Sequence, residues 1–341
     1  VVVGDGVETT AELADTIEKG KGVEQIKGLG WKKNGKVILN APRPLLMDLD
    51  SMPLPARHLL PNEKYFNFLS RRKNFTVLYT ESGCPGRCIF CDIGRARFRF
   101  KSAPRVLDEL EECYHKYNVR EFQFYDGNFV TNKKRVKEIC QGMVDRGLDM
   151  SWSVEARADM VNREILTDMK KAGCYRIQYG IETGNSHIME VIKKMETKQQ
   201  IADAVKLTKE IGISVLGFFM LGLPGETEET MEDTIKFMLS LPLDYASIAL
   251  TRSYPNTEMY EDWMKESGKD FYKDYTLGKI PAGSVIPLYN TDLAIPRIQE
   301  KVDEAYKRFF FRPIQVWRVM KDLRSPDQFR KYFWATLDMI K

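Results

Sequence analysis

The sequence predicts an α/β protein built on a parallel sheet. Apolar runs rich in β-forming residues alternate with amphipathic helical runs six times along the chain. This alternation implies parallel strands joined by right-handed crossovers, in either a (β/α) barrel or a doubly wound Rossmann-type sheet. In both architectures ligand sites lie at the carboxyl ends of the strands. The expected strands are residues 75–82, 121–127, 150–156, 175–182, 213–222 and 244–250.

The helices expected between these strands have recognisable start and stop signals. Thr197 and Gln200 have the spacing of a capping box, in which each side chain bonds to the other residue's backbone N–H, and this helix ends at Gly212. Pro104 suits the first turn of another helix, where its missing N–H has no helical partner to lose. The helix with Pro104 is expected over residues 103–117, and two more are expected over residues 162–172 and 227–239.

The two ends of the chain differ from this alternating core. Residues 1–40 contain one expected strand, "VVVGDG", then a helix and a turn-rich patch, and residues 41–62 hold five prolines typical of an extended connector. From about residue 291 onward we expect helices rich in aromatic residues. The first residues lack both an initiator methionine and the layout of a signal peptide, which indicates a longer protein upstream. The predicted domains are residues 1–40, 41–70, 71–256 and 257–341.

Composition limits the possible classes of protein. The chain has 341 residues, 43% of them apolar, and a formal net charge of +4, which indicates no particular polyanionic partner. No run approaches the length of a membrane span. Six cysteines are too few for a disulfide scaffold, so we expect a reducing, cytoplasmic location. Cys113, Cys140 and Cys174 stand singly in apolar segments, where small buried side chains are the usual interpretation.

The other three cysteines are clustered in "SGCPGRCIFCDIG". Cys84, Cys88 and Cys91 have the spacing C-x3-C-x2-C and directly follow the first expected strand. A structural zinc site takes four ligands, and the histidines of this chain lie far away in sequence. A redox pair would leave Cys84 unexplained. Three thiolates on a cubane iron–sulfur cluster leave one iron open for a substrate or cofactor.

With an aromatic residue, Phe90, just before the last cysteine, this segment resembles the CxxxCxΦC signature of the radical S-adenosylmethionine (SAM) superfamily. The resemblance implies a partial (β/α) barrel with six strands and an oxygen-sensitive [4Fe-4S] cluster held by the three cysteines. The open iron would chelate the amino and carboxylate groups of SAM, and reductive cleavage would yield a 5′-deoxyadenosyl radical. An electron donor such as flavodoxin or ferredoxin is then required. A zinc or redox site remains the alternative interpretation.

The resemblance also assigns contacts with SAM. Phe90, in the cysteine segment, is one of the implied cofactor-binding residues, and the others lie at the strand ends. Asp126 and Gly127, with Asn128, occupy the position of a short motif near the methionine amino group, although the family often has two glycines and an acid there. Glu155 is expected to contact the ribose or the amino group, and Arg157 to pair with a carboxylate. A strand-ending turn and a salt bridge at the barrel mouth are the structural alternatives.

Further contacts are implied at the fourth and fifth strands. Glu182 lies where the family often presents a polar group to the ribose hydroxyls. Lys193 or, in better alignment, Lys194 would reach the methionine carboxylate, although surface charge is the commoner role of such lysines. Backbone atoms pairing with the adenine edge are expected from Leu221, Gly222 and Leu223.

The amino-terminal residues resemble the end of the cobalamin-binding domain that precedes many radical SAM enzymes. The turn at Gly4, Asp5 and Gly6 after an apolar strand suits a Rossmann-type sheet, and the proline-rich connector follows it. The aromatic carboxy-terminal segment is similar to the helical tail of the same subfamily. The resemblance therefore implies a cobalamin-dependent methyltransferase or an oxidative cyclase. The alternative is a cobalamin-independent radical SAM oxidoreductase or a sulfur-inserting enzyme.

A basic stretch, "GRARFRFKSAPR", follows the cysteines. Arg and Phe alternate in it, as in some segments that bind nucleic acids. Five positive charges are few for such a binding surface, however, and the rest of the chain has nearly equal numbers of basic and acidic residues. An acidic small substrate, a loop shielding the active site and a plain solvated loop are the other interpretations. We therefore expect a small-molecule or peptide substrate rather than a nucleic acid, and the sequence identifies no catalytic residue.

Overall fold

The computed structural model of the chain describes residues 1–67, 69–286, 288–289 and 291–322. They fall into two compact units, Val1–Pro53 and Leu54–Lys341. The domain boundaries expected from the sequence remain predictions, and the part of the expected helical tail that follows residue 322 lies outside the described residues.

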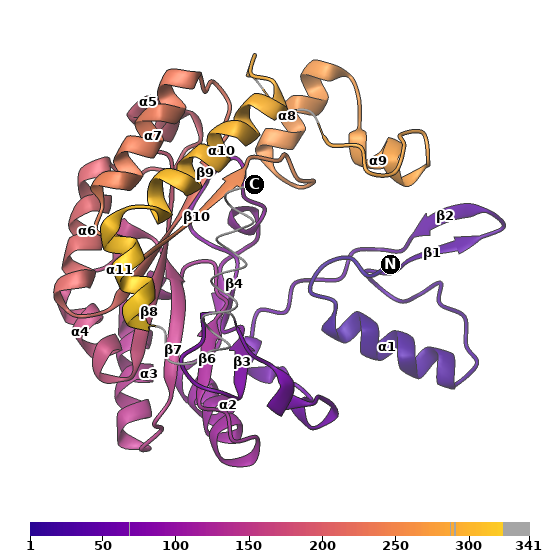
Figure 1. Cartoon of the computed structure of the whole chain (residues 1–341). Coiled ribbons are helices and arrows are strands. Elements are labelled where there is room, and N and C mark those ends of the chain that lie inside the picture. The colour runs from indigo at the N-terminus through magenta and orange to yellow at the C-terminus, as the bar shows by residue number, and fades with distance from the viewer. Residues whose placement is uncertain (68, 287, 290, 323–341) are drawn as a thin grey trace. The chain divides into compact units, whose positions relative to one another are not determined.

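Six parallel strands form the sheet of the larger unit, in the order β10-β9-β8-β7-β6-β3 (Figure 1). Each strand is added beside the one before it, with no reversal of order, as in a (β/α) barrel and unlike a doubly wound sheet. The predicted α/β class is confirmed. The strands are β3 (Phe75–Leu78), β6 (Glu121–Phe124), β7 (Ser151–Ala156), β8 (Cys174–Glu182), β9 (Ser214–Leu221) and β10 (Tyr245–Leu250).

Helices cover one face of this sheet (Figure 1). The predicted capping box is confirmed, since the Thr197 side chain accepts from the Gln200 N–H and the Gln200 side chain from the Thr197 N–H. The crossover helices are α2 (Ala103–Lys116), α3 (Lys133–Asp145), α4 (Arg163–Lys171), α5 (Ser186–Val191), α6 (Lys198–Glu210) and α7 (Glu228–Ser240). The later helices are α8 (Glu258–Ser267), α9 (Phe271–Thr276), α10 (Ile295–Phe310) and α11 (Pro313–Asp322).

The main core lies between the sheet and these helices. Successive strand residues point to opposite faces, so Phe122 and Phe124 on β6 and Trp152 on β7 are fully buried against the helices. The Phe124 ring contacts Trp152 edge-on at 5.3 Å between centroids. The intervening residues, such as Gln123 and Glu155, therefore belong to the opposite, inner face of the sheet.

A short antiparallel pair holds the cysteine segment. β4 (Glu81–Ser82) pairs with β5 (Arg99–Phe100), and the three clustered cysteines lie on the loop between them. Short 3₁₀ turns complete the secondary structure: η1 (Leu49–Ser51), η2 (Arg57–Leu59), η3 (Asn62–Lys64), η4 (Ile93–Arg95), η5 (Phe129–Thr131) and η6 (Ala158–Met160).

The smaller unit contains helix α1 (Val7–Glu18) and a hairpin of β1 (Gly30–Lys33) and β2 (Lys36–Leu39). The strand expected over residues 1–6 is wrong, because this segment forms only one β-bridge, between Val2 and Leu29. Gly4 and Gly6 have φ angles of 95° and 76°, which turn the chain out of an extended course and into α1.

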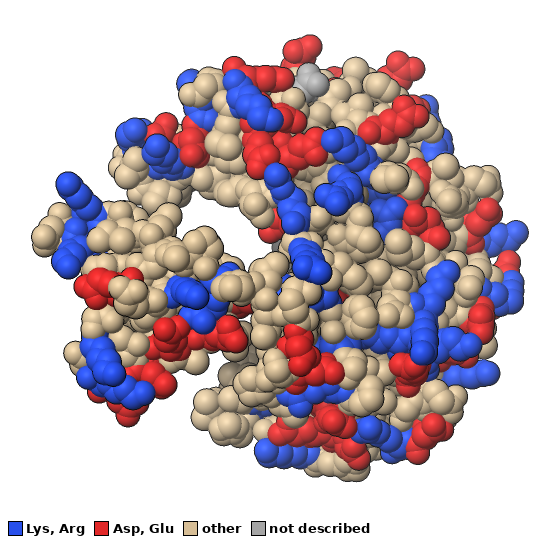
Figure 2. Space-filling model, turned by 180° about the vertical axis from the view of Figure 1, so that it is seen from behind, with Lys and Arg blue, Asp and Glu red and all other residues tan. Residues whose placement is uncertain are grey.

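Charge is distributed evenly over the surface in view. Basic and acidic side chains are interspersed on the face shown in Figure 2, in keeping with the net charge of +4. Among the residues the structure describes, none of the helices combines the length and the apolar character needed to cross a membrane.

Candidate active site

The three clustered cysteines lie half-buried on one loop and are free thiols. The loop folds back on itself at Gly83, which has a φ of 80°. A Cβ atom there would lie 2.7 Å from the Ala96 carbonyl oxygen, so only glycine fits. The loop can therefore present Cys84, Cys88 and Cys91 from a compact turn beside the strand ends.

The loop is fastened to two other parts of the larger unit. The Ile89 N–H donates to the Ile192 carbonyl at 3.1 Å, and the Ile89 carbonyl accepts from the Met259 N–H at 3.0 Å. Ile89 is buried in an apolar cluster with these two residues, and Phe90 packs against the same cluster. Phe90 thus helps to anchor the loop, and its predicted cofactor contact remains a prediction.

Two buried cations lie near the thiols. Burial raises the pKa of the Cys88 thiol to about 11, while Lys194 and then Arg157 oppose the rise. Burial also raises the pKa of the Cys84 thiol, and Arg157 again opposes the rise. The Cys91 thiol also raises the pKa of both Cys84 and Cys88. Cations of this kind stabilise thiolates, the form in which cysteine binds metals.

Lys194 is only 4% exposed, so its interpretation as surface charge is wrong. Its ammonium lies 3.5 Å from a Glu182 carboxylate oxygen and 3.2 Å from Glu196. Lys193 is the exposed member of the pair and bonds to Glu258. Since burying an ammonium is costly without partners, the two carboxylates account for its position beneath the cysteine loop.

Arg157 forms an ion pair within its own chain, which corresponds to the structural alternative, and its predicted role toward SAM stays a prediction. Its guanidinium donates to both oxygens of Asp159, at 3.0 and 2.9 Å, and lies 3.9 Å from Glu196. A Cβ added at Gly86 would be 3.4 Å from both Arg157 Nη1 and Cys84 Sγ. Arg157 therefore reaches the cysteine loop while Asp159 holds it in place.

Glu182 ends strand β8 in an unusual conformation. Its φ of 66° lies in the left-handed region, which is strained for a residue with a side chain, and the strand register shifts at the same point. Burial raises the pKa of its carboxyl, and Lys194 opposes the rise. The bend brings the carboxylate to Lys194 and to the neighbourhood of Cys88.

Asp126 and Asn128 are committed to contacts within the chain. One Asp126 oxygen accepts from the Thr80 and Glu81 N–H groups at 2.7 and 3.1 Å, and the other accepts from the Thr80 hydroxyl. The Asn128 oxygen accepts from the Arg157 N–H at 3.0 Å. Both side chains thus tie neighbouring strand ends together.

Two of the predicted residues remain open to a ligand. Gly127 is exposed beside the loop, where an added Cβ would lie 3.8 Å from that of Cys84. Glu155 is half-buried on β7, and burial, with Glu182 and Asp126 nearby, raises its pKa to about 7. Its carboxylate has no hydrogen-bond or ion-pair partner in the described part of the chain.

At the end of β9, sequence analysis missed Glu226. One of its oxygens accepts from the Gly222 and Leu223 N–H groups at 2.6 and 2.9 Å, whereas its other oxygen is buried without a partner within the described ranges. Gly222 has a φ of 87°, and Leu221 is fully buried. The sequence feature that could have identified it is the acidic residue four positions after Gly222, in "GLPGE".

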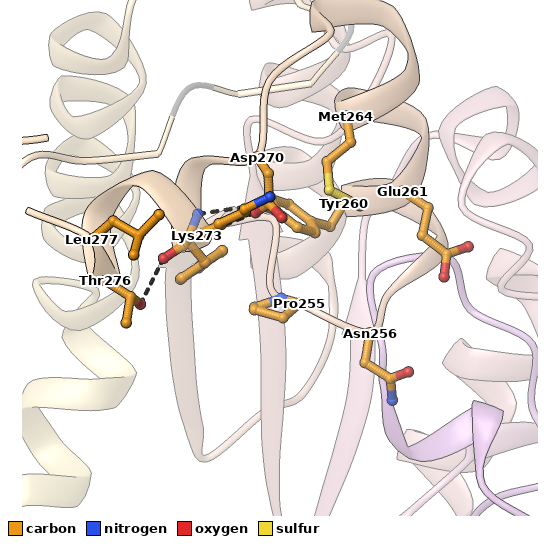
Figure 3. Close-up of a pocket in the computed structure, with 10 residues that line it drawn as sticks. Pro255, Asn256, Tyr260, Glu261, Met264, Asp270, Lys273, Thr276 and Leu277 are labelled. Carbon is orange, nitrogen blue, oxygen red and sulfur yellow. Dashed lines mark hydrogen bonds between the residues drawn. The ribbon is translucent and has the colours of Figure 1, made fainter. Parts of the chain in front are cut away.

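A surface hollow lies elsewhere, between α8 and α9 (Figure 3). It has a volume of about 620 Å³, and its lining includes Pro255, Asn256 and Tyr260, whose hydroxyl donates to Asp270 at 2.7 Å. None of the clustered cysteines lines this hollow. The candidate site is therefore the region beneath the cysteine loop.

The donor chemistry at this region fits an iron–sulfur cluster. Two of the three free thiols, Cys84 and Cys88, lie near buried cations, and cysteine thiolates are the usual ligands of such clusters. Among the residues that the structure describes, no three His, Cys, Asp or Glu side chains lie close enough to hold a single metal ion.

The fold and the site together define an α/β partial barrel with a three-cysteine loop at the carboxyl ends of its strands. Residues 79–238 match the family model described as the Radical SAM superfamily. The chain therefore contains a radical SAM domain over these residues, and members of this superfamily use a [4Fe-4S] cluster and SAM.

Three proteins illustrate the similarity. An uncharacterized methyltransferase of Pyrococcus horikoshii is 40% identical over 265 residues, which cover 76% of this chain and 57% of the relative. The anaerobic magnesium-protoporphyrin IX monomethyl ester cyclase of Rubrivivax gelatinosus is 25% identical over 320 residues, 91% of this chain and 56% of the relative. The chain thus spans somewhat more than half the length of these relatives.

The third is a solved structure of OxsB, a cobalamin-dependent SAM radical enzyme with aqua-cobalamin and SAM bound. It superimposes with a TM-score of 0.67 at 16% sequence identity and covers 98% of this chain and 54% of that one. At this identity the similarity establishes the fold, and it confirms the predicted partial barrel.

Proposed function

We propose that the protein is a radical SAM enzyme that binds a [4Fe-4S] cluster through Cys84, Cys88 and Cys91. The observation that carries the proposal is the placement of three free thiols on one loop above the carboxyl ends of a six-stranded parallel sheet. When bound, the cluster supplies the electron that splits SAM into methionine and a 5′-deoxyadenosyl radical.

The chain's own residues would bind and orient SAM. Lys194 and Arg157 are the cations nearest the thiols and suit the methionine carboxylate. Glu182 is an acceptor for the amino group or the ribose hydroxyls. The N–H groups of Gly222 and Leu223 already donate to Glu226, so the adenine contact at this strand falls to other backbone atoms and to apolar surface.

The proposed outcome is cobalamin-dependent radical methylation or oxidative cyclisation of a small molecule or peptide. The similarity to a named methyltransferase, a named cyclase and the fold of a cobalamin-dependent enzyme supports this choice. Residues 1–53 form a separate unit, which supports an origin at the end of a preceding domain. A flavodoxin or ferredoxin would deliver the electron in the cytoplasm.

The test is the metal content and the activity of the full-length protein, with the proposed preceding domain included, purified without oxygen and supplied with cobalamin. We expect about four irons per chain, stoichiometric cobalt, and release of 5′-deoxyadenosine from SAM under reduction. Zinc in place of iron would contradict the cluster assignment. Iron and SAM cleavage without cobalt would favour a cobalamin-independent radical SAM oxidoreductase.

A further inference from the structure

Four side chains form one layer across the inner face of the sheet: Tyr79, Tyr125, Glu155 and Gln178, called here the inner layer. They come from the neighbouring strands β3, β6, β7 and β8, where Tyr79 and Tyr125 directly follow their strands. Glu155 is the register partner of Gln178, and the pairing of Phe124 with Val154 brings the next residues, Tyr125 and Glu155, side by side.

All four point away from the helices. The residues preceding each of them, Leu78, Phe124, Val154 and Ile177, belong to the core between sheet and helices. Because successive strand residues face opposite sides, the inner layer faces the barrel interior. The exposures agree, since Tyr79 is 58% and Tyr125 51% exposed although both adjoin fully buried strand residues.

The polar atoms of the inner layer lack partners. Neither tyrosine hydroxyl, nor the Glu155 carboxylate, nor the Gln178 amide makes a hydrogen bond to any residue within the described ranges, and Glu155 forms no ion pair there. Gln178 is only 8% exposed, and half-buried Glu155 is shielded enough for its pKa to rise to about 7. The set therefore offers unpaired acceptor atoms to a ligand that supplies donors.

The chemistry of the layer selects an organic cation. The two tyrosine rings meet edge to face at 5.5 Å, which leaves electron-rich ring surface beside the Glu155 carboxylate. Glu155 lies beside Tyr125 in the sheet, so its carboxylate is next to the tyrosine pair. Hard metal ions take six or more oxygen ligands, whereas one carboxylate with aromatic faces suits an ammonium group.

We propose that the inner layer binds a protonated amine of the substrate, with Glu155 as its counter-ion and Tyr79 and Tyr125 against its apolar part. Glu155 lies on β7, whereas Arg157 follows the carboxyl end of that strand, so the amine would lie deeper in the barrel than the cysteine loop that Arg157 reaches. This inference rests on the proposed function, because it assigns the substrate class of the same site.

The experiment titrates benzylamine into the iron-loaded, SAM-bound protein at about pH 8, where the amine is protonated, and follows binding by calorimetry. Benzyl alcohol is the neutral probe of the same shape. We expect benzylamine to bind the wild type and to bind Glu155→Gln about ten-fold more weakly or not at all, with Tyr79→Leu also weakened. Benzyl alcohol should bind weakly to each protein.

The matched control is Glu164→Gln, which removes an exposed carboxylate from α4 and should leave benzylamine binding unchanged. The proposal is overturned if the wild type does not bind benzylamine, if benzyl alcohol binds equally well, or if Glu155→Gln binds benzylamine like the wild type. A loss of SAM affinity alone in Glu155→Gln would assign this residue to the cofactor instead. Iron content and SAM cleavage by the wild type report separately on the proposed function.

Discussion

Cys88 combines a desolvated position with two nearby positive charges. Burial alone would keep its thiol protonated, and its pKa lies at about 11 despite Lys194 and Arg157. Coordination to iron removes this penalty, because the thiolate charge is then shared with the metal. The two cations further compensate the negative charge that three thiolates bring into a half-buried loop.

Replacing Cys88 by alanine should therefore abolish cluster binding and all reductive cleavage of SAM. Iron per chain and 5′-deoxyadenosine release are the measurements. Cys113→Ala is the matched control, since Cys113 is fully buried in the main core and far from the loop in sequence, and this variant should retain its iron. Residual SAM cleavage by Cys88→Ala would contradict the ligand assignment.

At the scale of secondary-structure elements, Asn128 joins the ends of β6 and β7. It is fully buried; its side-chain oxygen accepts from the Arg157 N–H, and its nitrogen donates to Thr131 at 2.9 Å. Asn128→Ala should lower the free energy of unfolding by about 2 kcal/mol, because the buried Arg157 N–H loses its acceptor. SAM affinity should fall as well, since Arg157 is no longer positioned.

The control for this prediction is Asn132→Ala. Asn132 caps α3 by accepting from the Arg135 N–H at 3.1 Å, so the variant should lose about 1 kcal/mol in stability while it keeps its SAM affinity. Urea unfolding and calorimetric SAM titration measure the two quantities. Equal SAM affinity in both variants would show that Asn128 serves stability only.

The strands and helices of the larger unit could be predicted because each satisfies a local rule. Strand alternation, the capping box at Thr197 and glycine at helix ends act within a few residues. The burial of Lys194 could not be predicted in this way. Lys193 and Met195, on either side of it, have φ angles of 54° and 56°, and these turns direct the side chain inward to Glu182. The contact of Asp126 with Thr80 is likewise beyond local rules, because Thr80 lies between β3 and β4, far away in sequence.

At the scale of the whole molecule, buried carboxyl groups should make stability depend on pH. Burial raises the pKa of Glu81 to about 8 and that of Glu155 and Glu226 to about 7, from an ordinary value of 4.5. Between these values the unfolded chain has lost protons that the folded chain still holds. The unfolded state is then favoured progressively, so stability should fall as pH rises from about 4.5 toward 8.

Glu226→Gln isolates one contribution to this dependence. The amide oxygen can still accept from the Gly222 and Leu223 N–H groups, but the side chain no longer ionises. Relative to the wild type, the variant should gain on the order of 3 kcal/mol in unfolding free energy as pH rises from about 4.5 to above 7. Urea unfolding of the iron-free protein at about pH 5 and pH 8 measures it. Glu229→Gln, which changes an exposed carboxyl in the first turn of the following helix, α7, should keep the wild-type dependence. Parallel pH dependences for Glu226→Gln and the wild type would mean that the Glu226 carboxyl is ionised in the folded protein throughout this range.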